Sequence, residues 1–285
     1  MTLATPDWLR TQRWFRSKQR PISSVIEVDR ADIPGVELRI LEVAYADGGH
    51  PDRYLLPTVG GDEPQDGHGA WHAFATVMAN GGEVRAQRGR FIGWRTEALE
   101  DLVPSAAEAI PALGERRMTV EQSNTSIVLG DRLILKVYRL LEPGDNPDLE
   151  VSAFLTRAGF TDTPPVAGGL TYEADDGQSC TAAMLQAFVP SRGDAWAAML
   201  AALSENPARG IEVAVAVGRT TAAMHGALAS DPGNPAFPAR PATNAEAAAW
   251  RTSAERQLSE AVTAVSGDDH ARMVEVAPHA TARFA

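Results

Sequence analysis

The segment EQSNTS at residues 121–126 is followed closely by LILKVY at residues 133–138, and together they are the most informative part of this 285-residue chain. The first segment is polar and predicts a loop, whereas the second predicts an apolar β-strand with one charge, Lys136. A lysine buried in a strand costs free energy unless its ammonium group meets an anion. The pattern therefore indicates a strand that holds an anionic ligand, although a lysine on an edge strand would look the same.

A helix is predicted ten residues beyond Lys136. Asn146 suits the N-cap, Pro147 suits the first helical position, and the acids Asp148 and Glu150 complement the positive end of a helix. Apolar residues then recur at helical spacing. Glu150 could be an ordinary first-turn acid, but it also lies where its carboxylate could orient the ammonium group of Lys136. The lysine and the glutamate together favour a nucleotide-binding site.

The polar loop supplies the side chains and backbone N–H groups that can cradle phosphates. Its candidate phosphate-binding residues are Ser123, Asn124, Thr125 and Ser126. The loop lacks the glycines that are typical of the well-known phosphate-binding loops. An ordinary polar hairpin loop would therefore explain the same residues about as well.

Composition and charge exclude several classes of function. The formal net charge of −11 argues against general binding of nucleic acid or of an anionic membrane surface. The single cysteine, Cys180, excludes an intrachain disulfide and a cysteine-based zinc site. The first ten residues do not resemble a signal peptide, and no stretch approaches the ~20 apolar residues of a membrane span. We therefore expect a cytoplasmic protein.

The remaining pattern predicts an α+β protein with a β-rich N-terminal part and helices toward the C-terminus. Predicted strands cover residues 24–28, 36–43, 53–57, 118–122, 169–173 and 180–189. Predicted helices cover residues 7–20 and 71–78, begin near residue 193, and cover residues 211–229 and 243–265, while residues 98–114 are expected to form a linker.

Taken together, these segments resemble the actinobacterial maltokinases, which are relatives of the aminoglycoside phosphotransferases within the protein-kinase-like fold. The matching residues are Arg13-Trp14-Phe15 with Lys18, EQSNTS at 121–126, LILK at 133–136, LEPG at 141–144, NPDLE at 146–150 and QAFVP at 186–190.

The resemblance implies three domains: an N-terminal cap at residues 1–105, a nucleotide-binding N-lobe at 106–190, and an incomplete helical C-lobe at 191–285. It assigns phosphate binding to Lys136 with Glu150 as its partner, together with the loop residues at 123–126. It places Gln186, Phe188 and Val189 beside the adenine. Members of this family use ATP and Mg²⁺ to convert maltose to maltose 1-phosphate for glycogen and α-glucan biosynthesis, and they associate with trehalose synthase. A related group with the same cap phosphorylates glucosamine.

The sequence departs from the family at the catalytic loop, a His-Gly-Asp motif that lies beyond the long helix. The nearest match, Met224-His225-Gly226-Ala227, lies inside the predicted helix at 211–229 and has alanine in place of the acid. No catalytic residue and no metal ligand is therefore assigned to this chain. We expect it to be the N-terminal portion of a sugar kinase, inactive by itself. The alternative is a non-catalytic protein that binds a nucleotide or a partner through the cap and the N-lobe.

Overall fold

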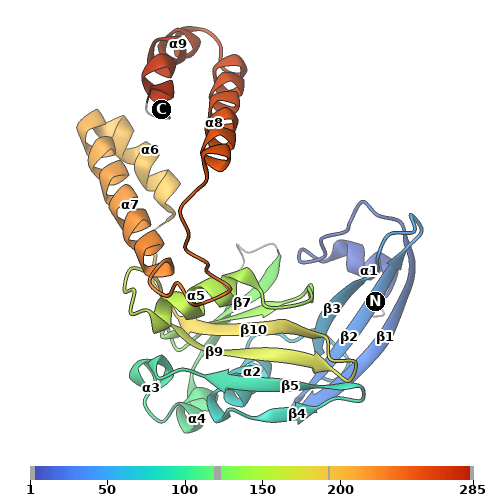
Figure 1. Ribbon diagram of the computed structural model, residues 1–285. Helices are drawn as coiled ribbons and strands as arrows, with labels where there is room; N and C mark the ends of the chain where they lie inside the picture. Colours follow the sequence, from blue (N-terminus) through green and yellow to red (C-terminus); the bar gives the residue numbers. More distant parts are fainter. Residues whose placement is uncertain (1–3, 119–122, 192, 283–285) are drawn as a thin grey trace. The chain divides into compact units, whose positions relative to one another are not determined.

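The computed structural model describes residues 4–118, 123–191 and 193–282 (Figure 1). Contacts divide the chain into two compact units, residues 1–230 and residues 231–285. The first unit contains two β-sheets, and every pairing between their strands is antiparallel. Antiparallel sheets with helices in separate parts of the chain define the α+β class, so the predicted class is confirmed.

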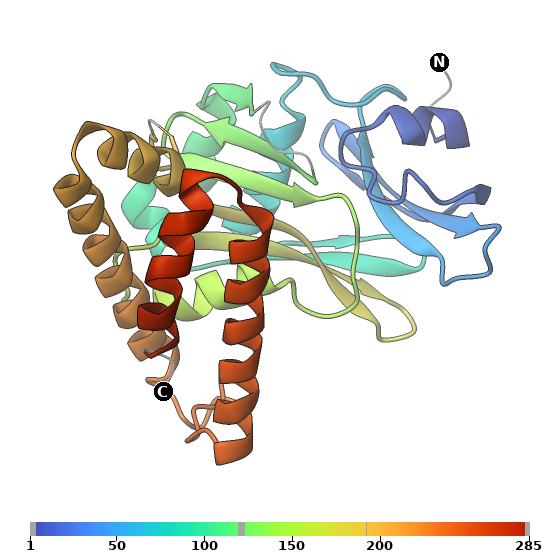
Figure 2. The same ribbon diagram turned by 90° about the horizontal axis from the view of Figure 1, so that it is seen from above.

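The N-terminal sheet contains β1 (Ile22–Ile33), β2 (Val36–Tyr45) and β3 (Asp52–Thr58) in that order. The strands predicted at 24–28, 36–43 and 53–57 are confirmed. The predicted helix at 7–20 is much shorter, because α1 (Pro6–Thr11) ends where the backbone of Gln12 becomes extended. Trp14 and Phe15 then pack on Tyr54, with ring centroids 5.8 and 5.1 Å away. This sheet with α1 lies at one end of the larger sheet (Figure 2).

The larger sheet has the strand order β4-β5-β9-β10-β8-β7-β6. Its strands are β4 (Glu83–Arg85), β5 (Gly89–Arg95), β6 (Glu115–Arg117), β7 (Asn124–Leu129), β8 (Leu133–Tyr138), β9 (Val166–Ala174) and β10 (Ser179–Ala187). The predictions of β8 and of the β9–β10 hairpin are confirmed, whereas β4 and β5 were not predicted. The strand predicted at 118–122 lies almost wholly outside the described residues. The sheet joins strands from both sides of the predicted domain boundary between residues 105 and 106.

Helices cover both faces of this sheet. On one face, α2 (Ala70–Asn80) packs in the main core with Leu135 and Leu185. On the other face, α5 (Pro147–Arg157) contributes Leu149 to a smaller cluster with Tyr138 and Met184. The two faces are distinct because neighbouring residues of a strand, such as 184 and 185, point in opposite directions.

The predicted linker at 98–114 is a packed segment and not a loose connection. It contains α3 (Ala98–Leu102), α4 (Ala106–Ala109) and the 3₁₀ turn η1 (Ile110–Ala112). Leu99 and Ile110 are completely buried in the main core. The two prolines that suggested a linker, Pro104 and Pro111, lie between and within these short helices, which explains why the prediction was wrong.

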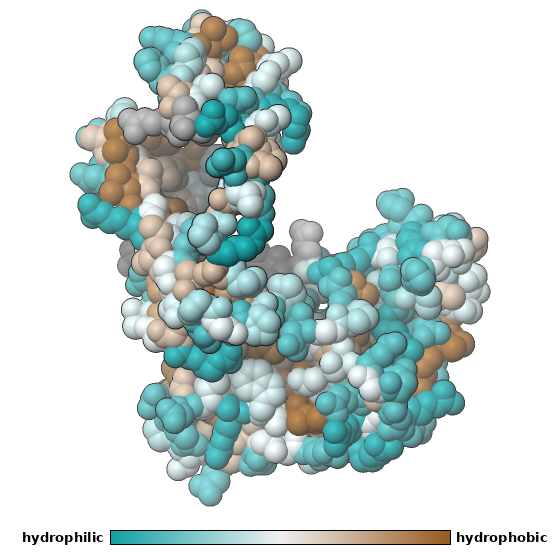
Figure 3. All heavy atoms as spheres, in the orientation of Figure 1, coloured by the Kyte–Doolittle hydropathy of each residue, from teal (hydrophilic) through white to brown (hydrophobic). Residues whose placement is uncertain are grey.

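In the part of the chain that the structure describes, four more helices follow the sheet. They are α6 (Ala195–Glu205), α7 (Pro207–Leu228), α8 (Asn244–Ala264) and α9 (Asp268–Thr281). The first three confirm predictions, with His225 inside α7 as expected, while α9 was not predicted. Among described residues, α6, α8 and α9 bury no side chain, and Figure 3 shows exposed apolar side chains along α6 and α7. Across the described residues, every helix is too short or too polar for a membrane span.

Gly93 of β5 is a position at which an added methyl group should strongly destabilise the protein. A Cβ there would collide with the backbone oxygen of Val77 and would lie 3.0 Å from the Cα of Met78. Because helix backbone cannot yield like a flexible side chain, we expect Gly93→Ala to lower the free energy of unfolding by about 1–3 kcal/mol. Gly218→Ala in α7 is the matched control, since a Cβ there meets nothing within 4 Å. Urea denaturation should show no loss, or a gain of up to about 1 kcal/mol, for the control. Equal losses for both variants would contradict close packing at Gly93.

Candidate functional site

Lys136 lies in the middle of a row of side chains that crosses three strands on one face of the larger sheet. In the strand register it stands opposite Ser126 of β7 on one side and Met184 of β10 on the other. Directly opposed residues project from the same face, so these three side chains are neighbours. The Lys136 side chain is 19% exposed. The sequence correctly predicted a largely buried lysine within an apolar strand.

The anionic partner of Lys136 is Asp148, at the start of α5. Its Nζ lies 3.1 Å from Asp148 Oδ2, and the hydroxyl of Tyr138 donates to the same oxygen at 3.0 Å. The side chain of Asn146 accepts a hydrogen bond from the backbone N–H of Asp148 at 2.9 Å, which confirms the predicted N-cap. The first turn of α5 thus presents a carboxylate to the strand lysine.

The predicted pairing of Lys136 with Glu150 is not formed in this structure, because Asp148 occupies that role. An α-helix turns by about 100° per residue, so side chains two residues apart point roughly 200° apart. Leu149, which lies between them, packs on the sheet, so Asp148 and Glu150 point to either side of it. The carboxylate in contact with Lys136 thus comes from the predicted turn but from Asp148, and the nucleotide-site role of Glu150 stays a prediction.

The predicted phosphate-binding loop is largely a strand. Asn124, Thr125 and Ser126 are the first residues of β7, Ser123 precedes it, and residues 121–122 lie outside the described residues. Thr125 points to the face opposite Lys136, where its Oγ1 accepts a hydrogen bond from Nε of Arg139 at 2.7 Å. A run of Thr, Ile and Val favours β-structure, which explains the difference. Only Ser126 and Asn124 share the face of Lys136.

The candidate adenine-binding residues lie at the end of β10. Gln186 stands opposite Ile134 and, being two residues from Met184, shares the face of Lys136. Phe188 lies beyond the strand, and its backbone N–H donates to the carbonyl oxygen of Arg132 at 2.8 Å. Val189 follows and is 57% exposed. The structure thus places Gln186 with Lys136, and Phe188 and Val189 at the adjoining strand end.

A buried charge that the sequence did not single out lies directly after β8. Arg139 is fully buried, and its guanidinium donates to Glu63 as well as to Thr125. Burial lowers the pKa of Arg139 to about 10, and the nearby Arg117 acts in the same direction, while Glu63 opposes both. Trp14 lies alongside, 5.1 Å from the guanidinium carbon. From sequence alone, Arg139 looks like a surface arginine after a strand, and no local signal reveals its burial.

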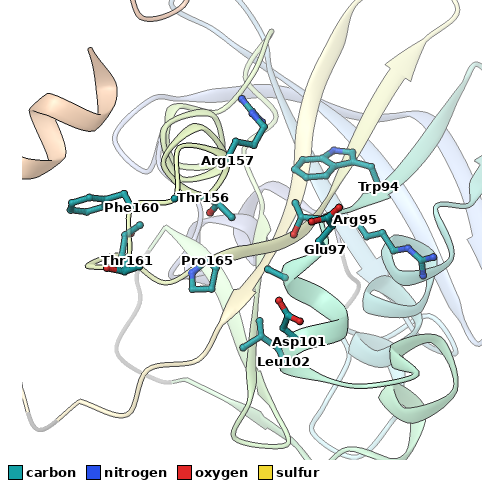
Figure 4. Close-up of a pocket in the computed structure, with 14 residues that line it drawn as sticks. Trp94, Arg95, Glu97, Asp101, Leu102, Thr156, Arg157, Phe160, Thr161 and Pro165 are labelled. Atoms are coloured by element: carbon teal, nitrogen blue, oxygen red, sulfur yellow. The ribbon is translucent and has the colours of Figure 1, made fainter. Parts of the chain in front are cut away.

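An open pocket of about 940 Å³ lies between the end of β5, α3 and the C-terminal end of α5 (Figure 4). Its lining includes Trp94, Glu97, Asp101, Arg157 and Phe160. No sequence prediction addressed it. It lies at the opposite end of α5 from Asp148, roughly 14 Å along the helix axis at 1.5 Å per residue. The pocket therefore lies away from the Lys136–Asp148 contact, but its lining residue Pro165 accepts a hydrogen bond from the backbone N–H of Ala187, which lies between Gln186 and Phe188.

Within the described residues, no three His, Cys, Asp or Glu side chains gather into a group that could hold a metal ion. Asp148 is the carboxylate in contact with Lys136, and it is already shared with Tyr138. The Lys136 site thus fits an anionic group, such as a phosphate, better than a cation.

Residues 8–88 match the family described as the maltokinase N-terminal cap domain. This part of the chain is similar to the cap domains of that family. The match lies within the cap predicted at 1–105, whose bounds stay a prediction. Two curated relatives extend the likeness beyond the cap, and both are glucosamine kinases. The one from Streptacidiphilus jiangxiensis is 34% identical over 179 residues, 60% of this chain and 39% of that protein. The one from Mycolicibacterium smegmatis is 30% identical over 167 residues, 55% of this chain and 40% of that protein.

Solved structures of a glucosamine kinase share the fold of the chain. Crystal form B has a TM-score of 0.62 at 23% identity, covering 100% of this chain and 62% of that one. The complex with glucosamine, ADP and inorganic phosphate has a TM-score of 0.61 at 23% identity, covering 100% of this chain and 64% of that one. The chain spans about two fifths of the length of the curated relatives it matches. The relation to cap-containing sugar kinases is thus supported, whereas the narrower prediction of a maltokinase is not.

Proposed function

We propose that the chain supplies the cap and the nucleotide-binding part of an ATP-dependent sugar kinase, and that glucosamine is the acceptor of the whole protein. The observation that carries the proposal is the position of Lys136. Its side chain is largely buried, and it lies between Ser126 and Met184 on one face of the larger sheet, in contact with the first turn of α5. The likeness to glucosamine kinases, one of them solved with ADP and glucosamine, supports both the donor and the acceptor.

The chemistry of the row suits the phosphates of a nucleotide. An ammonium group that is mostly shielded from water attracts an anion more strongly than an exposed one, because the local dielectric constant is lower. Asp148 holds Lys136 in place, and a phosphate oxygen would share or replace that contact. ATP, when bound, supplies the phosphoryl group. The hydroxyl of Ser126 flanks the same position, and we keep Gln186, Phe188 and Val189 as the proposed adenine contacts. No Mg²⁺ ligand is assigned to a described residue.

Maltose is the second candidate acceptor, favoured by the family to which the cap belongs. Phosphorylation assays with glucosamine and maltose in parallel test the choice. Faster phosphorylation of glucosamine than of maltose supports the proposal, and the reverse preference overturns the choice of acceptor.

The same assay on the 285-residue chain tests the prediction that these residues alone transfer no phosphoryl group. Nucleotide binding without any turnover in the whole protein would favour the non-catalytic alternative. Association with trehalose synthase and a cytoplasmic location remain predictions.

The chain offers a direct test of the nucleotide site, because it contains only two lysines, Lys18 and Lys136. An acyl phosphate derivative of ATP acylates amines that lie beside its phosphates. We expect it to label Lys136, and we expect excess ATP to prevent the labelling. Lys18, an exposed lysine of the cap, is the built-in control and should react without protection. Equal labelling of both lysines, unaffected by ATP, would refute the proposed site.

The matching affinity experiment uses Lys136→Met in a calorimetric titration with ATP. Hydrogen bonds to charged groups contribute about 1.5–3 kcal/mol, so the affinity should fall roughly ten-fold to hundred-fold. Lys18→Met should leave the affinity unchanged. Wild-type affinity in the Lys136→Met variant would exclude Lys136 as a phosphate-binding residue.

A further inference from the structure

The loop at residues 59–69, here called the cap loop, is attached to strands of the larger sheet by polar contacts, some partly buried and some exposed. Glu63 of the cap loop accepts hydrogen bonds from Arg139, directly after β8, and from Arg117 of β6, the latter at 3.3 Å. Asp66 accepts from the backbone N–H of Arg117 at 3.1 Å. Two acids of the cap loop, Glu63 and Asp66, thus bind residues of β6 and the residue after β8.

A third acid adds to this attachment from the opposite direction. Glu115 of β6 accepts hydrogen bonds from the backbone N–H groups of Gly67 at 2.6 Å and Gly69 at 3.1 Å. Its side chain is 2% exposed. Bonds between buried charged groups and backbone donors are stronger than neutral ones, so the cap loop is held rigidly on the edge of the sheet.

The backbone joins the same two parts of the molecule. Beyond β8, the chain continues along β3 of the cap as a short antiparallel pairing of Leu140 with Tyr54. The N–H of Leu55 donates to the carbonyl oxygen of Arg139 at 2.7 Å, and the N–H of Leu141 donates to that of Arg53 at 2.8 Å. The backbone that follows β8 is therefore hydrogen-bonded to β3 on both sides of Leu140, after a bend at Arg139.

Arg139 lies three residues after Lys136, at a bend one residue beyond the end of β8. Arg139 lies on the opposite face of the sheet from Lys136, because it donates to Thr125, whose side chain is on that opposite face. Three residues span at most about 10 Å, so only a short stretch of backbone separates the two side chains. A rotation or shift at Arg139 is therefore carried directly to Lys136.

We propose that Arg139 is a positioning residue: its hydrogen bonds to Glu63 of the cap loop and to Thr125 of β7 fix the position of β8, the strand that contains Lys136. The cap would then determine the position of the Lys136 side chain, on the other face of the sheet, without contacting the nucleotide. The structural part of this inference concerns β8 itself, and its effect on nucleotide affinity rests on the proposed function.

Glu63→Asp tests the inference, because it keeps the charge but is one methylene group shorter. We expect amide hydrogen exchange in β7 and β8, measured without nucleotide, to accelerate at least ten-fold, with little change in β4 and β5. Arg139→Lys, which keeps the charge but loses the fork of donors, should give the same pattern. Gly93→Ala is the matched control, since it destabilises the packing of β5 on α2 away from Arg139. Equal acceleration of β7 and β8 in Glu63→Asp and Gly93→Ala would overturn the inference, because it would show only a general loss of stability.

The nucleotide readout is separate from this test. Where the wild type binds ATP, Glu63→Asp should weaken binding at least five-fold, whereas Gly93→Ala should not. Unchanged affinity in Glu63→Asp would overturn the link between cap and site. A wild type that binds no ATP would refute the proposed function, while the exchange experiment would still decide whether Arg139 positions β8.

Discussion

Replacing Glu63 by alanine is expected to lower the free energy of unfolding by about 3–5 kcal/mol, which is the cost of leaving a buried charge without its partner. Arg139 is fully buried, and its carboxylate partner Glu63 is also shared by Arg117. Removing that carboxylate leaves two guanidinium groups close together, and the proximity of Arg117 already lowers the pKa of Arg139. Urea denaturation of the wild type and of Glu63→Ala measures the loss.

Glu83→Ala is the matched control for this prediction. Glu83 also pairs with an arginine, Arg90, at 3.1 Å, but their side chains are 52% and 43% exposed. Exposed pairs contribute about 0–1 kcal/mol, so this variant should lose little. The double variant Glu63→Leu with Arg139→Met removes both buried charges and should recover most of the loss. Similar small losses for Glu63→Ala and Glu83→Ala would mean that Arg139 is hydrated, contrary to its burial.

Local signals in the sequence were sufficient for the elements around Lys136. The apolar run of β8 and the cap of α5 both depend on residues close in the chain, and the structure reproduces them, including the bond from Asp148 N–H to the side chain of Asn146. The β9–β10 hairpin likewise follows from its Asp-Asp-Gly turn. Each of these elements is specified within about twelve residues, which is why periodicity and capping could predict them.

The sequence could not predict features that depend on distant partners. β5 joins the sheet by pairing with β9, about eighty residues later. The choice between Asp148 and Glu150 depends on the rotational phase of α5 against β8, which packing determines. Arg139 is buried only because the cap loop supplies Glu63, 76 residues earlier. Local sequence does not encode such contacts, so neither the contact of Asp148 with Lys136 nor the burial of Arg139 could be predicted from it.

Buried ionisable groups that are neutral in the folded protein should make it sensitive to alkali. Burial raises the pKa of the Cys180 thiol to about 12, although Arg53 acts in the opposite direction. Burial also raises the pKa of Tyr172, assisted by the hydrogen bond that its hydroxyl donates to Asp29 at 2.6 Å. Both groups are neutral in the folded and unfolded states near pH 7. As the pH rises past about 9 for the thiol and about 10 for the phenol, only the unfolded state loses its protons.

The stability contributed by these two neutral groups should therefore be complete below about pH 8.5 and fall steadily above it. One group that ionises only in the unfolded state lowers the free energy of unfolding by about 1.4 kcal/mol per pH unit, so Cys180 alone should lower it by roughly 2 kcal/mol between pH 9 and 10.5.

Urea denaturation at several pH values measures the slope of the free energy of unfolding against pH. Cys180→Ala should flatten it by about 1.4 kcal/mol per pH unit in that range, and Tyr172→Phe should flatten it above pH 10. The neighbouring Ser179→Ala, which removes no titrating group, should leave the slope unchanged. A slope that Cys180→Ala does not alter would mean that the thiol ionises as readily in the folded protein as in the unfolded chain, and that the main core admits solvent at β10.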